Sequence, residues 1–149
     1  MLDIVIGNGT VVTPQGAGPW EIGIKGEQIV AVGLPGSLPR DGARVIDAAG
    51  LIVTPGGIDP HTHLAHAIMS HPDQPSATLG PEDDTRGMAY GGTTTHIDFV
   101  YVRPGVDNIQ SAIEQRASRW KGNSHVDYAY HIPMNWPQHI RLSILQPRM

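Results

Sequence analysis

The sequence contains no cysteine, and this absence excludes both a disulfide framework and a metal site built on thiolates. Lysine is almost as rare, because only Lys25 and Lys121 occur among the 149 residues. No stretch reaches the ~18 consecutive apolar residues of a membrane span. The N-terminus also lacks the basic and apolar regions of a signal peptide. These absences predict a cytoplasmic protein that has no membrane partner.

Basic charge is also in short supply. Lys and Arg together number 10 against 14 Asp and Glu, which gives a formal net charge of −4. The charged residues are scattered, so neither a nucleic-acid-binding patch nor a polybasic membrane-binding segment is indicated. Histidine, in contrast, is plentiful at 8 residues, as are glycine at 18 and proline at 13. Without cysteine, any metal must be held by histidine and carboxylate side chains.

The first third of the chain is typical of short β-strands joined by tight turns. Runs of β-branched and apolar residues alternate with Gly-rich and Pro-rich segments, a pattern that favours a small sandwich-like module. The Asn8-Gly9 pair between two such runs predicts a β-hairpin. The strands expected from this pattern cover residues 4–6, 10–13, 21–25, 28–32 and 44–47.

From residue 55 onward, expected strands alternate with expected helices, which predicts a parallel βαβ arrangement. A complete (β/α)8 barrel needs about 250 residues, so only about three of its units fit here. The predicted fold is therefore α/β: a small β-sandwich-like domain in residues 1–54, followed in 55–149 by the truncated start of a (β/α)8 (TIM) barrel. Strands are expected at 58–64, 93–100 and 126–132, helices at 81–90 and 106–121, and a loop at 65–80.

Two histidines, His61 and His63, lie near the end of the first expected barrel strand. Residues at positions i and i+2 of a strand point to the same face, so the two imidazoles would project together, with Asp59 on the same side. Imidazoles at this spacing can bind one Zn²⁺-like ion, and Asp59 could orient a ligand from behind or act as a structural cap. The spacing alone is equally compatible with two loop histidines that bind no metal.

The residues around this pair resemble the cyclic amidohydrolases, and among them most closely the hydantoinases and dihydropyrimidinases. The resemblance is carried by Val53-Thr54-Pro55-Gly56-Gly57-Ile58-Asp59-Pro60-His61-Thr62-His63-Leu64 and, further along, by Gly91-Gly92-Thr93-Thr94 and Ile97-Asp98-Phe99. Two earlier segments, residues 6–12 and 45–50, are similar to the N-terminal module of that family. The similarity extends to about residue 135.

The resemblance implies a small β-domain and a (β/α)8 barrel with a centre of two divalent metal ions, expected to be Zn²⁺. His61 and His63 match the positions that bind the more buried ion. The family's other ligands are a carboxylated lysine, two later histidines and a late aspartate, and none can be placed in this chain. Neither Lys25 nor Lys121 lies at the end of a barrel strand, where the bridging lysine is needed. The full-length family member is expected to be a homo-oligomer.

The implied reaction is hydrolysis of the C–N bond of a small cyclic amide, such as a hydantoin or a dihydropyrimidine. An allantoinase, a dihydroorotase or an N-acyl amino acid deacylase of the same superfamily is an alternative. A non-catalytic scaffold on this fold is another, although a scaffold has no need of His61 and His63. Because the remaining ligands and the proton-shuttling carboxylate are missing, the chain alone is expected to be an inactive fragment that binds Zn²⁺ weakly. Residues 137–149 depart from the family pattern, which a frameshift, a truncated reading frame or a partial record would each explain.

The other candidate residues are expected to be structural. His96 shares a face with Asp98 and is expected to be a hydrogen-bonded interior histidine rather than a ligand. Trp120 is expected in the core, whereas His66 and His71 are expected to be solvated loop residues. The histidines that belong to no motif are His125, His131 and His139.

Overall fold

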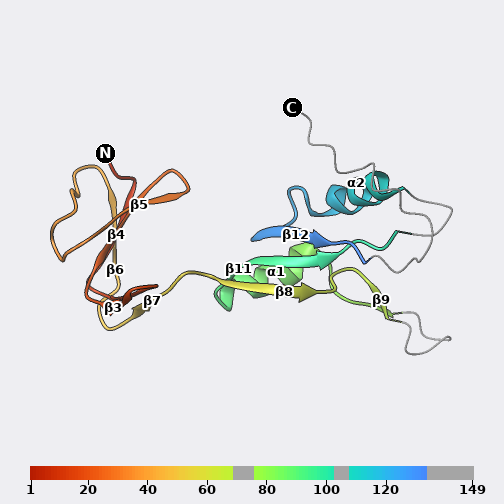
Figure 1. Cartoon of the computed structure of the whole chain (residues 1–149), viewed down its shortest axis with the longest axis horizontal. Coiled ribbons are helices and arrows are strands. Elements are labelled where there is room, and N and C mark those ends of the chain that lie inside the picture. Colours follow the sequence, from red (N-terminus) through yellow and green to blue (C-terminus); the bar gives the residue numbers. More distant parts are fainter. Residues whose placement is uncertain (69–75, 103–107, 134–149) are drawn as a thin grey trace. The chain divides into compact units, whose positions relative to one another are not determined.

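A computed structural model describes residues 1–68, 76–102 and 108–133 of the chain (Figure 1). The chain divides into two compact units, Met1–Pro55 and Gly56–Met149. In the described residues the first unit is built from strands alone, whereas the second alternates strands with helices. None of the helices in the described ranges is long and apolar enough to span a membrane.

The first unit contains two small sheets. The four-stranded sheet has the order β5 (Gln28–Gly33), β4 (Glu21–Lys25), β1 (Ile4–Gly7) and β6 (Arg44–Asp47). The three-stranded sheet has the order β3 (Gly16–Gly18), β2 (Thr10–Thr13) and β7 (Ile52–Val53). β1 is parallel to β6 and β2 is parallel to β7, whereas the other pairs are antiparallel. The five strands predicted for this region are present, and β3 and β7 are two short additional ones.

The hairpin predicted at Asn8-Gly9 is wrong, because β1 and β2 belong to different sheets. Asn8 has a positive φ of 64°, and its Nδ2 donates to Asp47 Oδ1 at 2.9 Å. A Cβ on Gly9 would lie 2.8 Å from the Cβ of Ala48, so only glycine lets the chain pass this close to its neighbour. The Asn-Gly pair therefore marks a corner between two sheets.

The interior of the first unit is apolar except for one carboxylate. Its buried hydrophobic residues are Val5, Val11, Ile22 and Ala48. Glu21 is buried among them and accepts hydrogen bonds from the Arg40 guanidinium and from the backbone N–H of Leu38. The backbone N–H of Gly36 and the Arg40 guanidinium hold the pKa of Glu21 below its usual value despite its burial. The Glu21–Arg40 pair is therefore charged in the folded unit.

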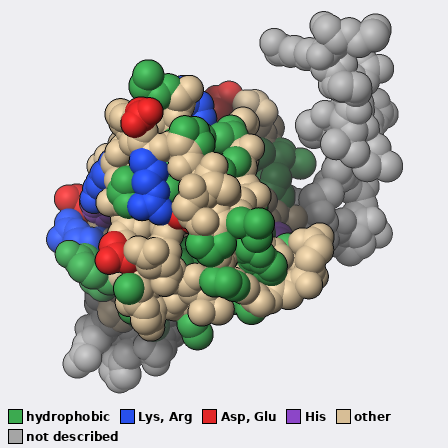
Figure 2. All heavy atoms as spheres, turned by 90° about the vertical axis from the view of Figure 1, so that its left-hand side faces the viewer, with side chains coloured by type: hydrophobic (Ala, Val, Ile, Leu, Met, Phe, Trp, Pro, Cys, Tyr) green, Lys and Arg blue, Asp and Glu red, His purple; other side chains and the backbone are tan. Residues whose placement is uncertain are grey.

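Hydrophobic side chains also reach the surface of the first unit. Figure 2 shows hydrophobic side chains gathered in patches between polar ones on the side of the molecule that it displays. On β5, the exposed fractions are 64% for Ile29, 53% for Val30 and 53% for Val32. Ile29 and Val32 also border a recess of about 470 Å³ whose other apolar walls include Val11, Trp20, Ile22 and Val53. The first unit therefore leaves apolar surface in contact with solvent.

The second unit contains a parallel sheet with the order β12 (Asp127–His131), β11 (Thr93–Phe99) and β8 (Gly57–Thr62). Helix α1 (Pro81–Tyr90) connects β8 to β11, and α2 (Ile109–Trp120) connects β11 to β12 (Figure 1). The predicted parallel βαβ arrangement is thus confirmed. The expected loop at 65–80 contains a short antiparallel pair, β9 (Ala67–Ile68) and β10 (Ser76–Ala77). Two predictions, the start of a helix at residue 106 and the unusual segment 137–149, lie outside the described residues.

α1 begins at Pro81, as predicted, and α2 begins at Ile109. Pro81 opens α1, followed by Glu82, Asp83 and Asp84, whose negative charge is favourable at a helix N-terminus. In α2, the side chain of Asn108 caps the helix by accepting the N–H of Ser111 at 2.8 Å. Trp120, at the end of α2, has no exposed surface and packs edge-on against Tyr130 of β12. α2 therefore covers the face of the sheet that carries Tyr130.

Candidate metal site

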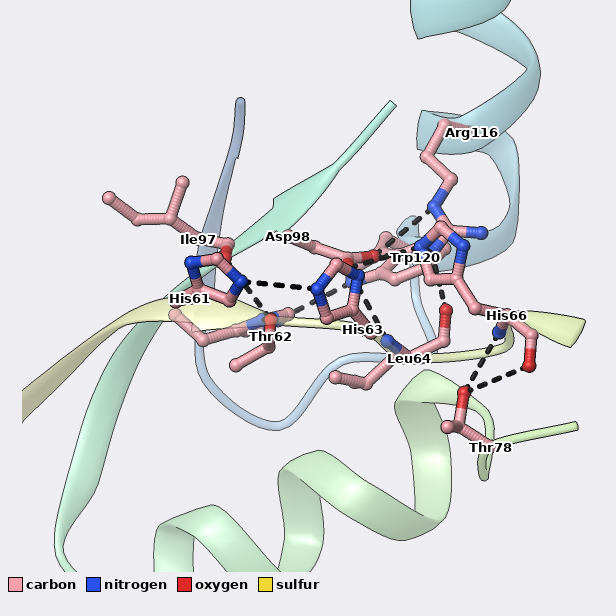
Figure 3. A network of polar contacts seen from close by, with 11 residues as sticks. His61, Thr62, His63, Leu64, His66, Thr78, Ile97, Asp98, Arg116 and Trp120 are labelled. Carbon is pink, nitrogen blue, oxygen red and sulfur yellow. Dashed lines mark hydrogen bonds and ion pairs between the residues drawn. The ribbon is translucent and has the colours of Figure 1, made fainter. Parts of the chain in front are cut away.

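His61 and His63 turn their imidazoles toward each other at the C-terminal end of β8 (Figure 3). Their Nε2 atoms are 3.2 Å apart, and both residues are exposed. Two nitrogen ligands of a tetrahedral Zn²⁺, each about 2.0–2.1 Å from the ion, lie about 3.3 Å apart. The pair therefore has the spacing of two ligands of one metal ion, and an ion can reach it from solvent.

A third ligand does not join this pair in the described part of the chain. Among the residues described, no group of three or more His, Cys, Asp or Glu side chains could hold a metal ion. Lys25 is in β4 and Lys121 follows α2, so neither lies at the C-terminal end of the parallel sheet. The described residues thus offer two ligands, fewer than the four of a tetrahedral site.

Aromatic rings lie next to the two imidazoles. The ring centroid of Phe99, at the end of β11, lies 4.6 Å from that of His61 and 4.7 Å from that of His63. Phe99 stacks on His63 with an angle of 16° between the ring planes, and the Tyr101 ring lies 6.5 Å from His63. Ring contacts at these distances are favourable and restrict the rotation of both imidazoles.

Asp59, expected from the sequence to orient a ligand or to act as a structural cap, contacts the backbone of the pair. Its Oδ1 accepts the N–H of His61 at 3.1 Å. His131, a residue without a sequence motif, reaches the same stretch from β12, because its Nε2 donates to the carbonyl oxygen of Pro60 at 2.9 Å. The backbone that leads into His61 is therefore held by two side chains.

His96 is an interior histidine, as the sequence predicts. It has no exposed surface, and its Nε2 lies 3.4 Å from Trp120 Nε1 while its Nδ1 lies 2.9 Å from the Thr62 hydroxyl. An indole N–H can only donate, so Nε2 accepts and the Nδ1–H donates to Thr62, whose hydroxyl donates to the Ile97 carbonyl at 3.2 Å. Burial lowers the pKa of His96, which favours the neutral ring that this pattern requires. His96 thus anchors the residue between the two histidines of the pair.

The prediction that His66 is solvated is wrong. Its side chain is 19% exposed, and its Nε2 lies 2.6 Å from Arg116 Nη2 and 3.5 Å from Asp98 Oδ1. Burial and the Arg116 cation lower the pKa of His66. The prediction fails because Arg116 reaches the loop from α2, 50 residues later in the chain. His71 and His139 lie outside the described residues.

Asp98 and Arg116 form a buried ion pair beside the histidine pair, which the sequence does not reveal. Arg116 Nη2 and Nε lie 2.5 and 3.2 Å from Asp98 Oδ2. Asp98 Oδ1 also accepts the N–H of Leu64 at 3.3 Å, and Arg116 Nη2 donates to the carbonyl of Leu64. The sequence indicates only that Asp98 needs a partner, because a carboxylate on the covered face of a β-branched strand must be paired. Nothing in the sequence selects Arg116 as that partner.

Known proteins resemble this chain over most of its length. A model of the amidohydrolase family matches residues 44–127. The D-hydantoinase of Rhizobium radiobacter is 40% identical over 131 residues, which cover 88% of this chain and 27% of that protein. An allantoinase of Escherichia coli (strain K12 / DH10B) is 35% identical over 127 residues, which cover 85% of this chain and 26% of that protein.

A solved structure also matches. The dihydropyrimidinase from Brevibacillus agri NCHU1002 is 35% identical, with a TM-score of 0.76 over 89% of this chain and 27% of that one. The chain therefore spans 26% to 27% of the length of the relatives that it resembles.

Proposed function

The chain belongs to the amidohydrolase family, and from this premise we propose that it is the N-terminal part of a metal-dependent hydrolase that opens cyclic amides such as hydantoins or dihydropyrimidines. The observation that carries the proposal is the 3.2 Å separation of the two Nε2 atoms of His61 and His63. The names of two relatives, a D-hydantoinase and a dihydropyrimidinase, support the substrate class.

The proposed architecture is a small β-sandwich-like domain in residues 1–54 and, from residue 55, the first about three units of a (β/α)8 barrel. The parallel order of β8, β11 and β12 supports it. Barrel enzymes carry their active sites at the C-terminal ends of the strands, and His61 and His63 lie at such an end. The proposal also includes a cytoplasmic location, expected from the sequence, and a homo-oligomeric full-length protein, which the family resemblance implies.

In the proposed site, His61 and His63 bind a divalent metal through their Nε2 atoms, and Zn²⁺ suits nitrogen ligands at this spacing. A metal held there would act as a Lewis acid, which would polarise the ring carbonyl and lower the pKa of a bound water. Asp59 holds the backbone of His61 at 3.1 Å, so its part is to orient a ligand without binding the ion. Phe99 restricts the rotation of both imidazoles. A site for two metal ions needs more ligands than His61 and His63, the two that the described residues bring together.

An allantoinase is the alternative that a specific observation favours, because the Escherichia coli enzyme of that name is 35% identical to this chain. The D-hydantoinase match is higher, at 40%. The exposed and mutually facing Nε2 atoms of His61 and His63 disfavour a non-catalytic scaffold, because a structural role would not require them.

Zinc binding tests the metal site directly. We expect the chain to bind Zn²⁺ in equilibrium dialysis and the H61A/H63A variant to lose that binding. The matched control is H125A, because His125 is exposed and belongs to no part of the proposed site. Equal zinc binding by the wild-type chain and H61A/H63A would contradict the proposal.

A chimera tests the substrate class. Residues 1–133 would replace the matching part of the Rhizobium radiobacter D-hydantoinase, and ring opening of hydantoin, dihydrouracil and allantoin would be followed. We expect turnover of the first two and its loss in the H61A/H63A chimera. Turnover of allantoin alone would favour the allantoinase. A folded chimera that binds zinc without turning over any of the three would count against all of these enzymes.

A further inference from the structure

Leu64, the residue that follows His63, is held by side chains at both of its backbone polar groups. Its N–H donates to Asp98 Oδ1 at 3.3 Å, and its carbonyl accepts from Arg116 Nη2. Both contacts come from other elements, since Asp98 is in β11 and Arg116 is in α2. The peptide that joins His63 to Leu64 is therefore held to the sheet, and the next peptide, from Leu64 to Ala65, is held to the helix that covers the sheet.

The chain turns sharply immediately after Leu64. Ala65 has a φ of 49°, in the left-handed region that residues other than glycine rarely adopt. Its N–H donates to the Leu79 carbonyl at 2.7 Å. The N–H of His66 donates to Thr78 Oγ1 at 2.8 Å (Figure 3). A strained backbone persists only where its surroundings determine it, and such strain is frequent at functional sites.

The two groups that hold Leu64 are themselves buried and paired. Asp98 has no exposed side-chain surface and that of Arg116 is 11% exposed. The Arg116 guanidinium also lies over the Trp120 ring, 4.2 Å from its centroid, so the arginine is fixed on two sides. Removing two charges from water is costly even when they pair. A buried pair of this kind therefore favours a role beyond general stability.

The same arginine contacts the histidine pair by a second route. Its Nη2 lies 2.6 Å from His66 Nε2, and the His66 ring meets the His63 ring edge-to-face with centroids 5.3 Å apart. A guanidinium can only donate, so the two N–H bonds of Nη2 are shared among Asp98 Oδ2, the Leu64 carbonyl and His66 Nε2, which accepts. His66 Nε2 therefore faces Arg116 and is not available to a metal. Both routes from Arg116 end at His63, one through the backbone of Leu64 and one through the ring of His66.

We propose that the buried Asp98–Arg116 pair is a positioning device that fixes His63 so that its Nε2 faces that of His61 at metal-ligand spacing. This inference rests on the proposed function, because it assumes that the two imidazoles bind a metal ion. The pair touches neither ion nor substrate and acts through Leu64 and His66. A merely structural pair would stabilise the unit but leave the zinc affinity of the folded chain unchanged.

The test measures zinc affinity site by site in the 149-residue chain. Zn²⁺ alone is titrated while the imidazole nitrogen resonances of His61 and His63 are followed by NMR, and H61A/H63A gives the background from other histidines. D98N keeps an oxygen that can accept the N–H of Leu64 but removes the negative charge. R116K keeps the positive charge but has a shorter side chain and lacks the second nitrogen, Nε, that also contacts Asp98.

The expected result is a loss of about 10- to 100-fold in zinc affinity for D98N, as for other residues that orient metal ligands. R116K is expected to lose less, and the metal-free spectrum of both variants should change at His63. The matched control is E21Q, which makes the same carboxylate-to-amide change at a buried carboxylate of the first unit that is paired with the half-exposed Arg40. E21Q should bind zinc as the wild-type chain does. Only resonances of the folded chain are titrated, so a loss of stability does not imitate a loss of affinity.

Two other outcomes overturn the inference in distinguishable ways. If D98N and R116K bind zinc at His61 and His63 as tightly as the wild-type chain, the positioning role is wrong while the proposed metal site stands. If the wild-type chain binds zinc no better than H61A/H63A, the proposed metal site fails and the positioning role fails with it.

Discussion

The imidazole of His96 lies where a charged ring cannot be hydrated. Burial lowers its pKa, and the nearby carboxylates of Asp98, Asp59 and Asp84 only partly oppose this shift. In the unfolded chain the same imidazole titrates near its usual value of about 6.5. As the pH falls below that value, the unfolded chain takes up a proton that the folded chain does not, so folding becomes less favourable.

We therefore expect the free energy of unfolding to decrease as the pH is lowered from about 7.5 to about 5.5. The H96N variant should show a smaller decrease, because an amide can still donate to Thr62 but does not titrate. Urea unfolding at a series of pH values measures both. Equal pH dependence of wild type and H96N would show that His96 does not contribute.

At this scale, the sequence predicts residues whose role depends on local spacing. The facing imidazoles of His61 and His63 follow from their i and i+2 positions on a strand, and the buried Trp120 follows from the apolar stripe of its helix. The contacts of His66 could not be predicted, because they depend on Arg116, which lies 50 residues later in the chain. Only the packing of α2 on the sheet brings the two together.

At the scale of elements, α2 depends for its cap on Asn108, the residue before its first turn. Asn108 Oδ1 accepts the N–H of Ser111 at 2.8 Å, and the Asn108 carbonyl accepts from the Ser111 hydroxyl at 3.0 Å. The N–H groups of a first helical turn have no partner within the helix. Because α2 carries Arg116 and Trp120, the stability of its first turn affects the residues that support the candidate site.

We expect N108A to lower the free energy of unfolding by about 1 kcal/mol, the usual cost of losing a side-chain cap. N108D should remain close to the wild-type value, because aspartate keeps the acceptor and its charge suits a helix N-terminus. Urea unfolding of the three proteins measures this difference. A destabilisation of N108D as large as that of N108A would show that the cap does not act through its oxygen.

The positions of the strands and helices in the sequence are predicted better than the pairing of the strands. β-branched runs indicate β4, β6 and β11, and a proline followed by acidic residues indicates the start of α1. The predicted pairing of β1 with β2 is wrong, because the partners of β1 are β4 and β6, which lie about 20 and about 40 residues away in the chain. A local Asn-Gly signal shows that the chain turns, but it does not specify which strand lies beside which.

At the scale of the whole molecule, the number of metal ligands limits what the chain can do. The described residues bring together two imidazoles and no group of three or more potential metal ligands. The relatives named D-hydantoinase and dihydropyrimidinase are matched over only 27% of their lengths. The barrel itself remains a prediction, because its closure depends on strands other than the three described here.

We expect the purified 149-residue chain to show no ring opening of hydantoin or dihydrouracil, because the described residues bring together only two imidazoles, which hold a metal weakly. Chromatographic detection of the ring-opened product, with the Rhizobium radiobacter D-hydantoinase as positive control, measures this. Zinc-dependent turnover by the wild-type chain that disappears in H61A/H63A would refute the expectation.

The contacts of Asp98 and Arg116 with the backbone of Leu64 have a consequence for hydrogen exchange. Leu64 is 2% exposed and its N–H points at a buried carboxylate, whereas His61 and His63 are open to solvent. The amide proton of Leu64 should therefore exchange slowly with deuterium, although the imidazole of the preceding residue, His63, is exposed to solvent. Exchange there requires Asp98 to release the N–H. The exchange rate of this one proton therefore reports how often the hydrogen bond between Leu64 and Asp98 opens.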